Sequence, residues 1–294
     1  MATKKLTDLS VVRKLLSQLG VRPAKRFGQN FLVDEHIVSE ICHHVSEKTP
    51  DVVVEIGPGL GALTQGIVDV VPSVVAVEID KRLASGLAKR LAEHVNLEVR
   101  NCDILAFDFC REFEGQSVVV LGSLPYRITT PILRHLIKHR SVISDACLIT
   151  QLEVAEKIRH SPGKDGSSLG VFVNSFADVS GLRTIRKGSF FPVPDVESQY
   201  WELSFLASPR FSADEAAFFS VVRTLYRNRR KMSRRALQDL LPINAIANIL
   251  EVAEIDGTAR GETLSFAELD RLAQGCLPFI SCTPATDREA DDKD

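Results

Sequence analysis

Apolar residues in the first two thirds of the chain follow two patterns that are typical of a layered α/β protein. Short apolar runs predict buried strands, and stretches with apolar residues three or four positions apart predict helices between them. The expected strands span residues 52–56, 74–79, 97–101, 117–122, 146–151 and 199–205. The expected helices span residues 60–71, 81–94 and 129–139. This alternation predicts a mostly parallel sheet with helices on both faces.

The pattern changes at Pro209, beyond which it is wholly helical. Helices are expected at about residues 212–229, 231–241, 244–253 and 266–275. Residues 167–176 fit neither the helical nor the strand period of apolar residues. The linker at 207–210 therefore predicts a first domain of residues 1–206 and a smaller helical domain of residues 207–281. The acidic end, residues 282–294, lacks apolar periodicity and is expected to be a disordered tail.

Composition adds the class of protein. The 294 residues are 45% apolar and 25% charged, as in ordinary globular proteins. No apolar run approaches the roughly 18 residues of a membrane span. The basic N-terminus is not followed by the continuous apolar core of an export signal. We therefore expect a cytoplasmic protein without a membrane partner.

Cysteine and histidine spacings point away from metal chemistry. The six cysteines include no C-x-x-C pair and lie mostly in apolar contexts, which favours buried free thiols in a reducing compartment. The seven histidines, among them His43 and His44, show no ligand spacing. Neither a metal site nor a disulfide is expected.

Charge is strongly segregated, although the net charge is only −2. Residues 223–235 contain seven cations and no acidic residue, and the first 26 residues add further basic positions. Such cations repel one another unless a polyanion neutralises them, which favours nucleic-acid binding over the alternative of a solvated helix face. The expected RNA-binding residues are Arg223, Arg227, Arg229, Arg230, Lys231, Arg234 and Arg235.

A glycine loop follows the first of the expected parallel strands. Gly57, Gly59 and Gly61 stand where the strand gives way to a helix, which lets a ligand approach the backbone closely. Glu78 ends the next strand, about twenty residues on, and is placed to bind ribose hydroxyls. Residues 57–62 also fit G-x-G-x-x-A, so a nicotinamide dinucleotide is an alternative, as is a tight turn without a ligand.

Two acidic positions favour S-adenosylmethionine as the cofactor. Glu55 lies two residues before the first glycine, and Asp103 follows the third strand, where it could meet the adenine amino group. A dehydrogenase would require a proton-transfer residue near this sheet edge, and the sequence offers no convincing candidate. It would also leave the basic segment unexplained.

The tetrapeptide Ser123-Leu124-Pro125-Tyr126 follows the apolar run 117–121. A polar side chain, a carbonyl turned outward by the proline and an aromatic ring could together hold the exocyclic amino group of a flat base. Alone, such a tetrapeptide is usually a turn at a strand end. Together with the glycine loop, it predicts amino-group methylation.

These segments resemble motifs of a known family over nearly the whole chain. The family is that of the bacterial ribosomal RNA small-subunit adenine N6-dimethyltransferases, known from kasugamycin sensitivity. The segment 24–32, Ala-Lys-Arg-Phe-Gly-Gln-Asn-Phe-Leu, is the most specific because it has no generic structural explanation. The other matching segments are 55–64, 78–80, 102–103, 123–126, 190–194, 196–198 and 229–231.

The resemblance implies a Rossmann-like methyltransferase sheet followed by a smaller all-helical domain. It implies a substrate of two adjacent adenosines in the loop of the last small-subunit ribosomal RNA helix, modified during subunit assembly by a monomer without metal. By the resemblance, the cofactor pocket is lined by Asn30, Leu32, Gly57, Gly59, Glu78, Asp103 and Ser123.

Ser123 departs from the family, which has asparagine at this place. The N6 lone pair of adenine is delocalised into the ring, so acceptors that bind its protons help to localise it; here these are Ser123 and the Leu124 carbonyl. A serine hydroxyl is also an acceptor, but the serine side chain is shorter than that of asparagine. A contact lengthened in this way loses about 1–2 kcal/mol, which predicts methyl transfer roughly tenfold to thirtyfold slower. The alternative is a weakly catalytic or non-catalytic ribosome-assembly factor on the same fold.

Two aromatic residues are the expected clamp for the base. Stacking hides N6, so the adenine must be extruded and held between rings. Tyr126 and Phe190 are the candidates. A core aromatic before a proline turn is the competing explanation of Phe190.

Overall fold

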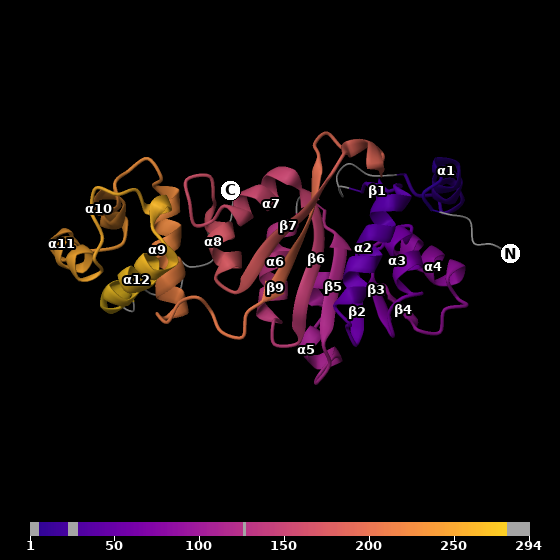
Figure 1. Cartoon of the computed structure of the whole chain (residues 1–294), viewed down its shortest axis with the longest axis horizontal. Helices are drawn as coiled ribbons and strands as arrows, with labels where there is room; N and C mark the ends of the chain where they lie inside the picture. Colours follow the sequence, from indigo (N-terminus) through magenta and orange to yellow (C-terminus); the bar gives the residue numbers. More distant parts are fainter. Residues whose placement is uncertain (1–5, 23–28, 126–127, 281–294) are drawn as a thin grey trace. The chain divides into compact units, whose positions relative to one another are not determined.

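The structure, a computed structural model, describes residues 6–22, 29–125 and 128–280 (Figure 1). The chain divides into two compact units. The first contains the residues up to Ala155 together with Asp178–Phe205. The second contains Glu156–Ala177 together with the residues from Leu206 onward.

A seven-stranded sheet forms the centre of the first unit, with strand order β4-β3-β2-β5-β6-β9-β7 (Figure 1). Parallel pairing joins β4, β3, β2, β5 and β6, whereas β9 runs antiparallel to β6. The expected parallel sheet is confirmed, and its valine-rich central strands are buried on both faces, as parallel strands usually are. The strands are β2 Val52–Ile56, β3 Val74–Val77, β4 Leu97–Arg100, β5 Val118–Ser123, β6 Ile143–Gln151, β7 Ala177–Ile185 and β9 Ser198–Phe205.

Helices cover both faces of this sheet. From β2 the chain moves in one direction to β3 and β4, and later in the other direction from β5 to β6. Right-handed crossovers therefore place α3 and α4 on one face and α6 on the other. Apolar residues of α2 and α3 share a core cluster with β2, β5 and β6. The helices are α2 Glu35–Glu47, α3 Ala62–Ile67, α4 Lys81–Arg90, α5 Phe109–Glu112 and α6 Thr129–Lys138.

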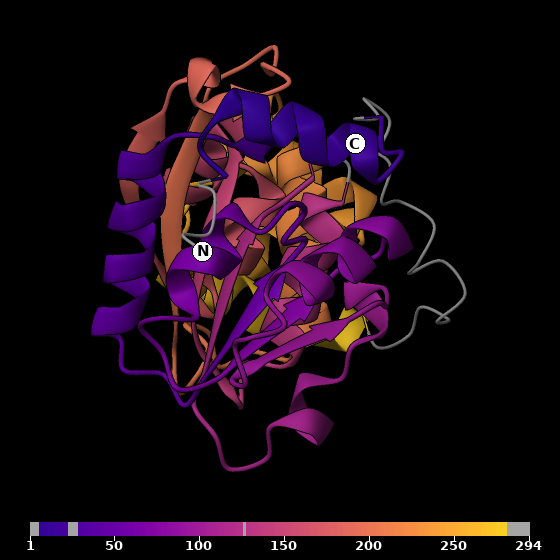
Figure 2. The same cartoon turned by 90° about the vertical axis from the view of Figure 1, so that its right-hand side faces the viewer.

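The N-terminal part of the first unit adds elements that the apolar pattern did not predict. Helix α1, Leu9–Gln18, begins at the capping residue Asp8. Strand β1, Phe31–Leu32, pairs antiparallel with β8, Phe190–Phe191. Each of these strands is only two residues long, too short to show any periodicity. Figure 2 presents the first unit with its indigo and purple helices towards the viewer.

The second unit is helical. It contains α8 Ser168–Asn174, α9 Glu215–Arg227, α10 Ser233–Ala236, α11 Ile243–Val252 and α12 Phe266–Ile280; helix α7, Leu152–Arg159, crosses the boundary between the units. The helical prediction beyond Pro209 is confirmed. Among the described residues, no helix has both the length and the apolar content to cross a bilayer.

The structure differs from the expected domain boundary at residues 156–177, which group with the C-terminal helices. Aromatic packing explains this grouping. The ring centroid of Phe172 lies 5.0 Å from that of Phe219, and Phe176 lies 5.7 Å from Phe211. The ambiguous segment is thus a helix whose phenylalanines belong to the second core. The expected tail, residues 282–294, lies outside the described residues.

Candidate functional site

Parallel pairing brings the predicted cofactor residues to one edge of the sheet. Gly57 N–H donates to the Val77 carbonyl at the end of β3, and Glu78 N–H donates to the Arg100 carbonyl at the end of β4. Ser123 is the last residue of β5, next to the pair Ile56 and Gly122. The carboxyl ends of four strands therefore meet, as expected for ligand sites of open α/β sheets.

The glycine loop requires its glycines for two different reasons. Gly57, Gly59 and Gly61 have φ of 63°, 59° and 81°, which residues with a Cβ atom rarely adopt. Gly61 is also crowded, since a Cβ atom there would lie 2.4 Å from Leu87 Cδ1. At Gly57 the same atom would meet nothing within 4 Å. The loop is packed against α4 at Gly61 and has open space at Gly57, which fits a cofactor on that side.

Glu78 is held at the centre of this edge. Its Oε2 accepts from Gly59 N at 3.0 Å, and its Oε1 accepts from Asp80 N at 2.9 Å. Burial raises the pKa of Glu78, while these two backbone N–H groups act in the opposite direction. The carboxylate is thus fixed by the backbone that follows β2 and β3, in the position expected for binding ribose hydroxyls.

A second carboxyl, that of Glu55, lies beneath the loop. It is 2% exposed, and its Oε2 accepts from Thr64 Oγ1 at 2.6 Å. Burial, with a smaller contribution from the charge of Glu78, raises the pKa of Glu55 to about 7. The residue was singled out from the sequence for its spacing, but its partner Thr64 was not, because their contact depends on the turn between β2 and α3.

Asp103 and two apolar neighbours complete the edge. Asp103 caps a short 3-10 helix through Leu105 N, at 2.9 Å from Oδ1, and is exposed. Ile79 is 66% exposed and Leu105 is 38% exposed. Apolar side chains exposed beside a carboxylate suit the flat face of an adenine ring. Sequence reasoning missed both, because their apolar character alone predicts burial.

Ser123 and Leu124 stand directly beyond this pocket. Ser123 is half-buried, and Leu124 is 3% exposed with its N–H bound to the Ile149 carbonyl at 2.9 Å. Gly122 lets the strands approach, since a Cβ atom there would lie 2.9 Å from the Ile56 carbonyl oxygen. Tyr126, the expected aromatic partner, lies outside the described residues.

The remaining predicted pocket residues lie on or beside β1 and β8. Asn30 is half-buried directly before β1. Leu32 and Phe190 face each other in the strand register and are 6% and 3% exposed, within one core cluster. Phe190 is therefore packed in this structure, and a base could reach its ring only after a local rearrangement of β8.

The predicted RNA-binding cations lie in the second unit. Arg223 and Arg227 are exposed on α9, one turn apart. Arg229 differs from the others, because it is half-buried and its Nη2 donates to the Lys164 carbonyl. Its guanidinium also lies 5.6 Å from the centre of the Tyr226 ring. The exposed members of the set are Arg223, Arg227, Arg230, Lys231, Arg234 and Arg235.

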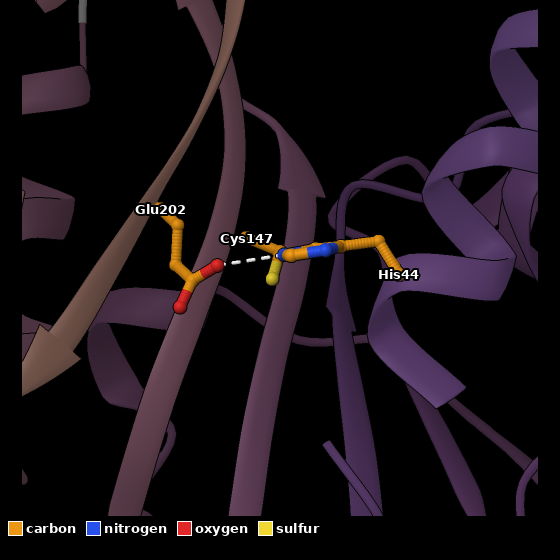
Figure 3. Close-up of side chains that lie close together, drawn as sticks. All are labelled: His44, Cys147 and Glu202. Atoms are coloured by element: carbon orange, nitrogen blue, oxygen red, sulfur yellow. Dashed lines mark hydrogen bonds and ion pairs between the residues drawn. The ribbon is translucent and has the colours of Figure 1, made fainter. Parts of the chain in front are cut away.

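A cluster of potential metal ligands lies elsewhere in the first unit. Figure 3 shows His44 of α2, Cys147 of β6 and Glu202 of β9, whose ligand atoms lie within 4.8 Å of one another. However, Glu202 already accepts from His44 Nε2 at 2.6 Å and from Lys48 Nζ at 2.5 Å. Ligand atoms around zinc stand at least about 3.3 Å apart, so the arrangement is that of an ion-pair network. It ties α2 to the sheet, and the expected absence of metal stays a prediction.

Comparison with known proteins identifies the family of this chain. The sequence profile of the family described as ribosomal RNA adenine dimethylase matches residues 21–272, which include every strand of the sheet and most of the helices. The chain belongs to this family. It is an S-adenosylmethionine-dependent adenine dimethyltransferase of ribosomal RNA, and the pocket around Glu78 fits that cofactor through its fixed carboxylate, exposed apolar neighbours and open loop.

Individual relatives align with this chain over most of their length. A ribosomal RNA small subunit methyltransferase A of Alkaliphilus oremlandii is 34% identical over 270 residues, covering 89% of this chain and 94% of the relative. One of Desulforapulum autotrophicum is 37% identical over 266 residues, covering 88% and 94%. One of Protochlamydia amoebophila is 36% identical over 269 residues, covering 90% and 94%.

Solved structures share the architecture. The 23S rRNA methyltransferase ErmE superposes with a TM-score of 0.66 at 29% identity, covering 84% of this chain and 99% of that one. A dimethyladenosine transferase of Plasmodium falciparum gives a TM-score of 0.72 at 24% identity, covering 82% and 95%. The predicted Rossmann-like methyltransferase sheet followed by C-terminal helices is confirmed.

Proposed function

We propose that this enzyme transfers methyl groups to N6 of two adjacent adenosines in the loop of the last helix of small-subunit ribosomal RNA, during subunit assembly. The names of the relatives, which all specify the small subunit, support the choice of RNA. The observation that carries the proposal is the position of Ser123 and Leu124, at the same sheet edge as the glycine loop and Glu78.

Ser123 and Leu124 supply the acceptors for the reacting amino group. When bound, S-adenosylmethionine would supply an electrophilic methyl group, and Glu78 would hold its ribose at this edge. The hydroxyl of Ser123 and the carbonyl of Leu124 accept hydrogen bonds from the adenine amino group, which aims the nitrogen lone pair at that methyl group. The nitrogen releases one proton to solvent for each methyl group that it gains. Because the Leu124 N–H is bound to β6, the segment holds its position while the base arrives. Orientation then supplies most of the rate enhancement.

Extrusion of the adenine completes the proposed substrate complex. Tyr126 is one ring of the clamp, and Phe190 is the other once β8 has shifted enough to uncover it. A base stacked on an aromatic ring gains about 1–3 kcal/mol, which offsets much of the cost of unstacking it from the RNA.

The exposed cations of the second unit position the RNA without reading its bases. They contact phosphates, and such contacts fix orientation while carrying no sequence information. The half-buried Arg229 instead braces the residues around Lys164, so we assign docking to the six exposed cations.

We place the enzyme in the cytoplasm, acting as a monomer. The five cysteines within the described part of the chain are free thiols, as in proteins of reducing compartments. Ribosomal subunits are assembled in that compartment in bacteria, which agrees with the proposed substrate.

Ser123 favours one alternative, an assembly factor that binds the subunit with little turnover. Labelled methyl transfer from S-adenosylmethionine to unmethylated small subunits, followed by base analysis, separates the two functions. We expect N6,N6-dimethyladenine at two adjacent positions in wild-type reactions, and less of it with Glu78→Ala when S-adenosylmethionine is limiting. Subunit binding without label in the wild-type reaction would establish the assembly factor instead.

A further inference from the structure

The side chain of Phe31 lies against the glycine loop. A Cβ atom placed on Gly59 would lie 3.0 Å from Phe31 Cε1 and 3.1 Å from Cδ1. Real Cβ atoms rarely tolerate such contacts, so the ring occupies the space that any other residue at position 59 would need. At Gly57, which has a similar positive φ, a Cβ atom would meet nothing within 4 Å. Phe31 therefore packs against Gly59 and not against Gly57.

Gly59 is one of two residues whose backbone N–H groups hold Glu78. Its N–H donates to Glu78 Oε2 at 3.0 Å, and the other carboxylate oxygen accepts from Asp80 N. A rotation of the peptide before Gly59 would break the first of these bonds and leave a buried carboxylate oxygen with one donor fewer. The orientation of the carboxylate thus depends on how firmly the Gly59 backbone is held.

Phe31 is itself fixed from both sides. It is 8% exposed and packs in an apolar cluster with Leu60 of the loop, Leu83 of α4 and Leu16 of α1. Its backbone pairs with Phe191 of β8, whose ring has the guanidinium of Arg13 at 5.3 Å from its centre. A ring held by three elements can transmit their rigidity to a loop whose glycines would otherwise move freely.

We propose that Phe31 is a positioning residue for the cofactor: its ring immobilises Gly59, and Gly59 in turn orients the Glu78 carboxylate towards the ribose. The residue does not touch the reacting atoms. It sets cofactor affinity. It also makes glycine obligatory at position 59, because its ring leaves no room there for a Cβ atom, in addition to the constraint of the positive φ. This role of Phe31 concerns the cofactor pocket only and does not depend on which RNA the enzyme methylates.

Binding of S-adenosylhomocysteine, measured by calorimetry on the full chain, tests this role. Phe31→Ala should weaken binding by roughly tenfold. Phe31→Leu, which keeps apolar volume, should retain more of the affinity and should raise the KM for S-adenosylmethionine while leaving kcat unchanged. The matched control is Leu16→Ala, which removes apolar volume from the same cluster away from Gly59 and should lower Tm without weakening binding.

A double-mutant cycle supplies the sharper test. Gly59→Ala and Gly57→Ala both carry the strain of a positive φ, but only the first meets Phe31. Adding Phe31→Ala to Gly59→Ala should restore part of the lost affinity, whereas adding it to Gly57→Ala should lower affinity further. Equal responses of the two glycine variants, or a loss in Leu16→Ala as large as in Phe31→Ala, would overturn the proposal.

Discussion

Replacing Glu55 with glutamine should remove a loss of folding stability that the first unit suffers as the pH rises. Glu55 is 2% exposed, and burial, with the smaller effect of Glu78, raises its pKa from 4.5 to about 7. The folded protein therefore holds a proton on this carboxyl more tightly than the unfolded chain does. The stability that follows is fully present below pH 4.5 and is lost as the pH rises through about 7.

The size of the effect follows from that interval. At about 1.4 kcal/mol for each pH unit, the difference between 4.5 and about 7 corresponds to about 3 kcal/mol. Glutamine is neutral at every pH, and its side-chain oxygen can still accept from Thr64 Oγ1. We therefore expect Glu55→Gln to match the wild type near pH 4.5 and to exceed its free energy of unfolding by up to about 3 kcal/mol at pH 8.5.

Urea unfolding followed by tryptophan fluorescence measures this difference in the first structural unit, which contains Glu55. Trp201 is the single tryptophan of the chain, is 1% exposed, and donates to Thr150 Oγ1 in the neighbouring strand of the same sheet. The exposed Glu114 provides the control, since Glu114→Gln makes the same substitution without changing a buried carboxyl. If Glu55→Gln differs from wild type by the same amount at pH 4.5 and pH 8.5, the reasoning about burial is refuted.

Three further predictions concern the cofactor and the RNA. Glu78→Ala should weaken S-adenosylhomocysteine binding by at least about tenfold, as one buried charged hydrogen-bonding group is lost; calorimetry that finds unchanged affinity removes the ribose assignment. Ser123→Asn should speed single-turnover methylation by roughly tenfold to thirtyfold with little change in RNA affinity, because the contact matters mainly in the transition state; an equal or slower rate would show a pocket built around serine. Changing the exposed Arg230, Arg234 and Arg235 to glutamine should flatten the salt dependence of subunit binding by about two to three log units per log unit of salt, with cofactor affinity kept. A wild-type salt slope in that triple variant would make these cations a solvated surface only.

The sequence alone determined six of the seven strands of the central sheet, all but β7, and the edge at which the site forms. Valine-rich runs alternating with amphipathic segments report burial directly, and parallel strands bring their carboxyl ends together wherever such runs are joined by helices. Gly57 and Glu78 follow two of these strands and Ser123 ends a third, so their convergence could be predicted before any contact was known. The C-terminal helices could be predicted as well, because their apolar residues recur at helical spacing.

Only the tertiary structure decided which residues pack around that edge and where the chain divides into its two units. Phe31 lies on Gly59, Phe190 is covered, and the phenylalanines of residues 156–177 join the second unit. Each of these contacts joins residues far apart in the chain, and those of Phe31 and Phe190 involve strands of only two residues, which carry no period. A periodic pattern records whether a residue is buried but not what buries it. That choice is made by the packing of the whole unit, and sequence spacing does not contain it.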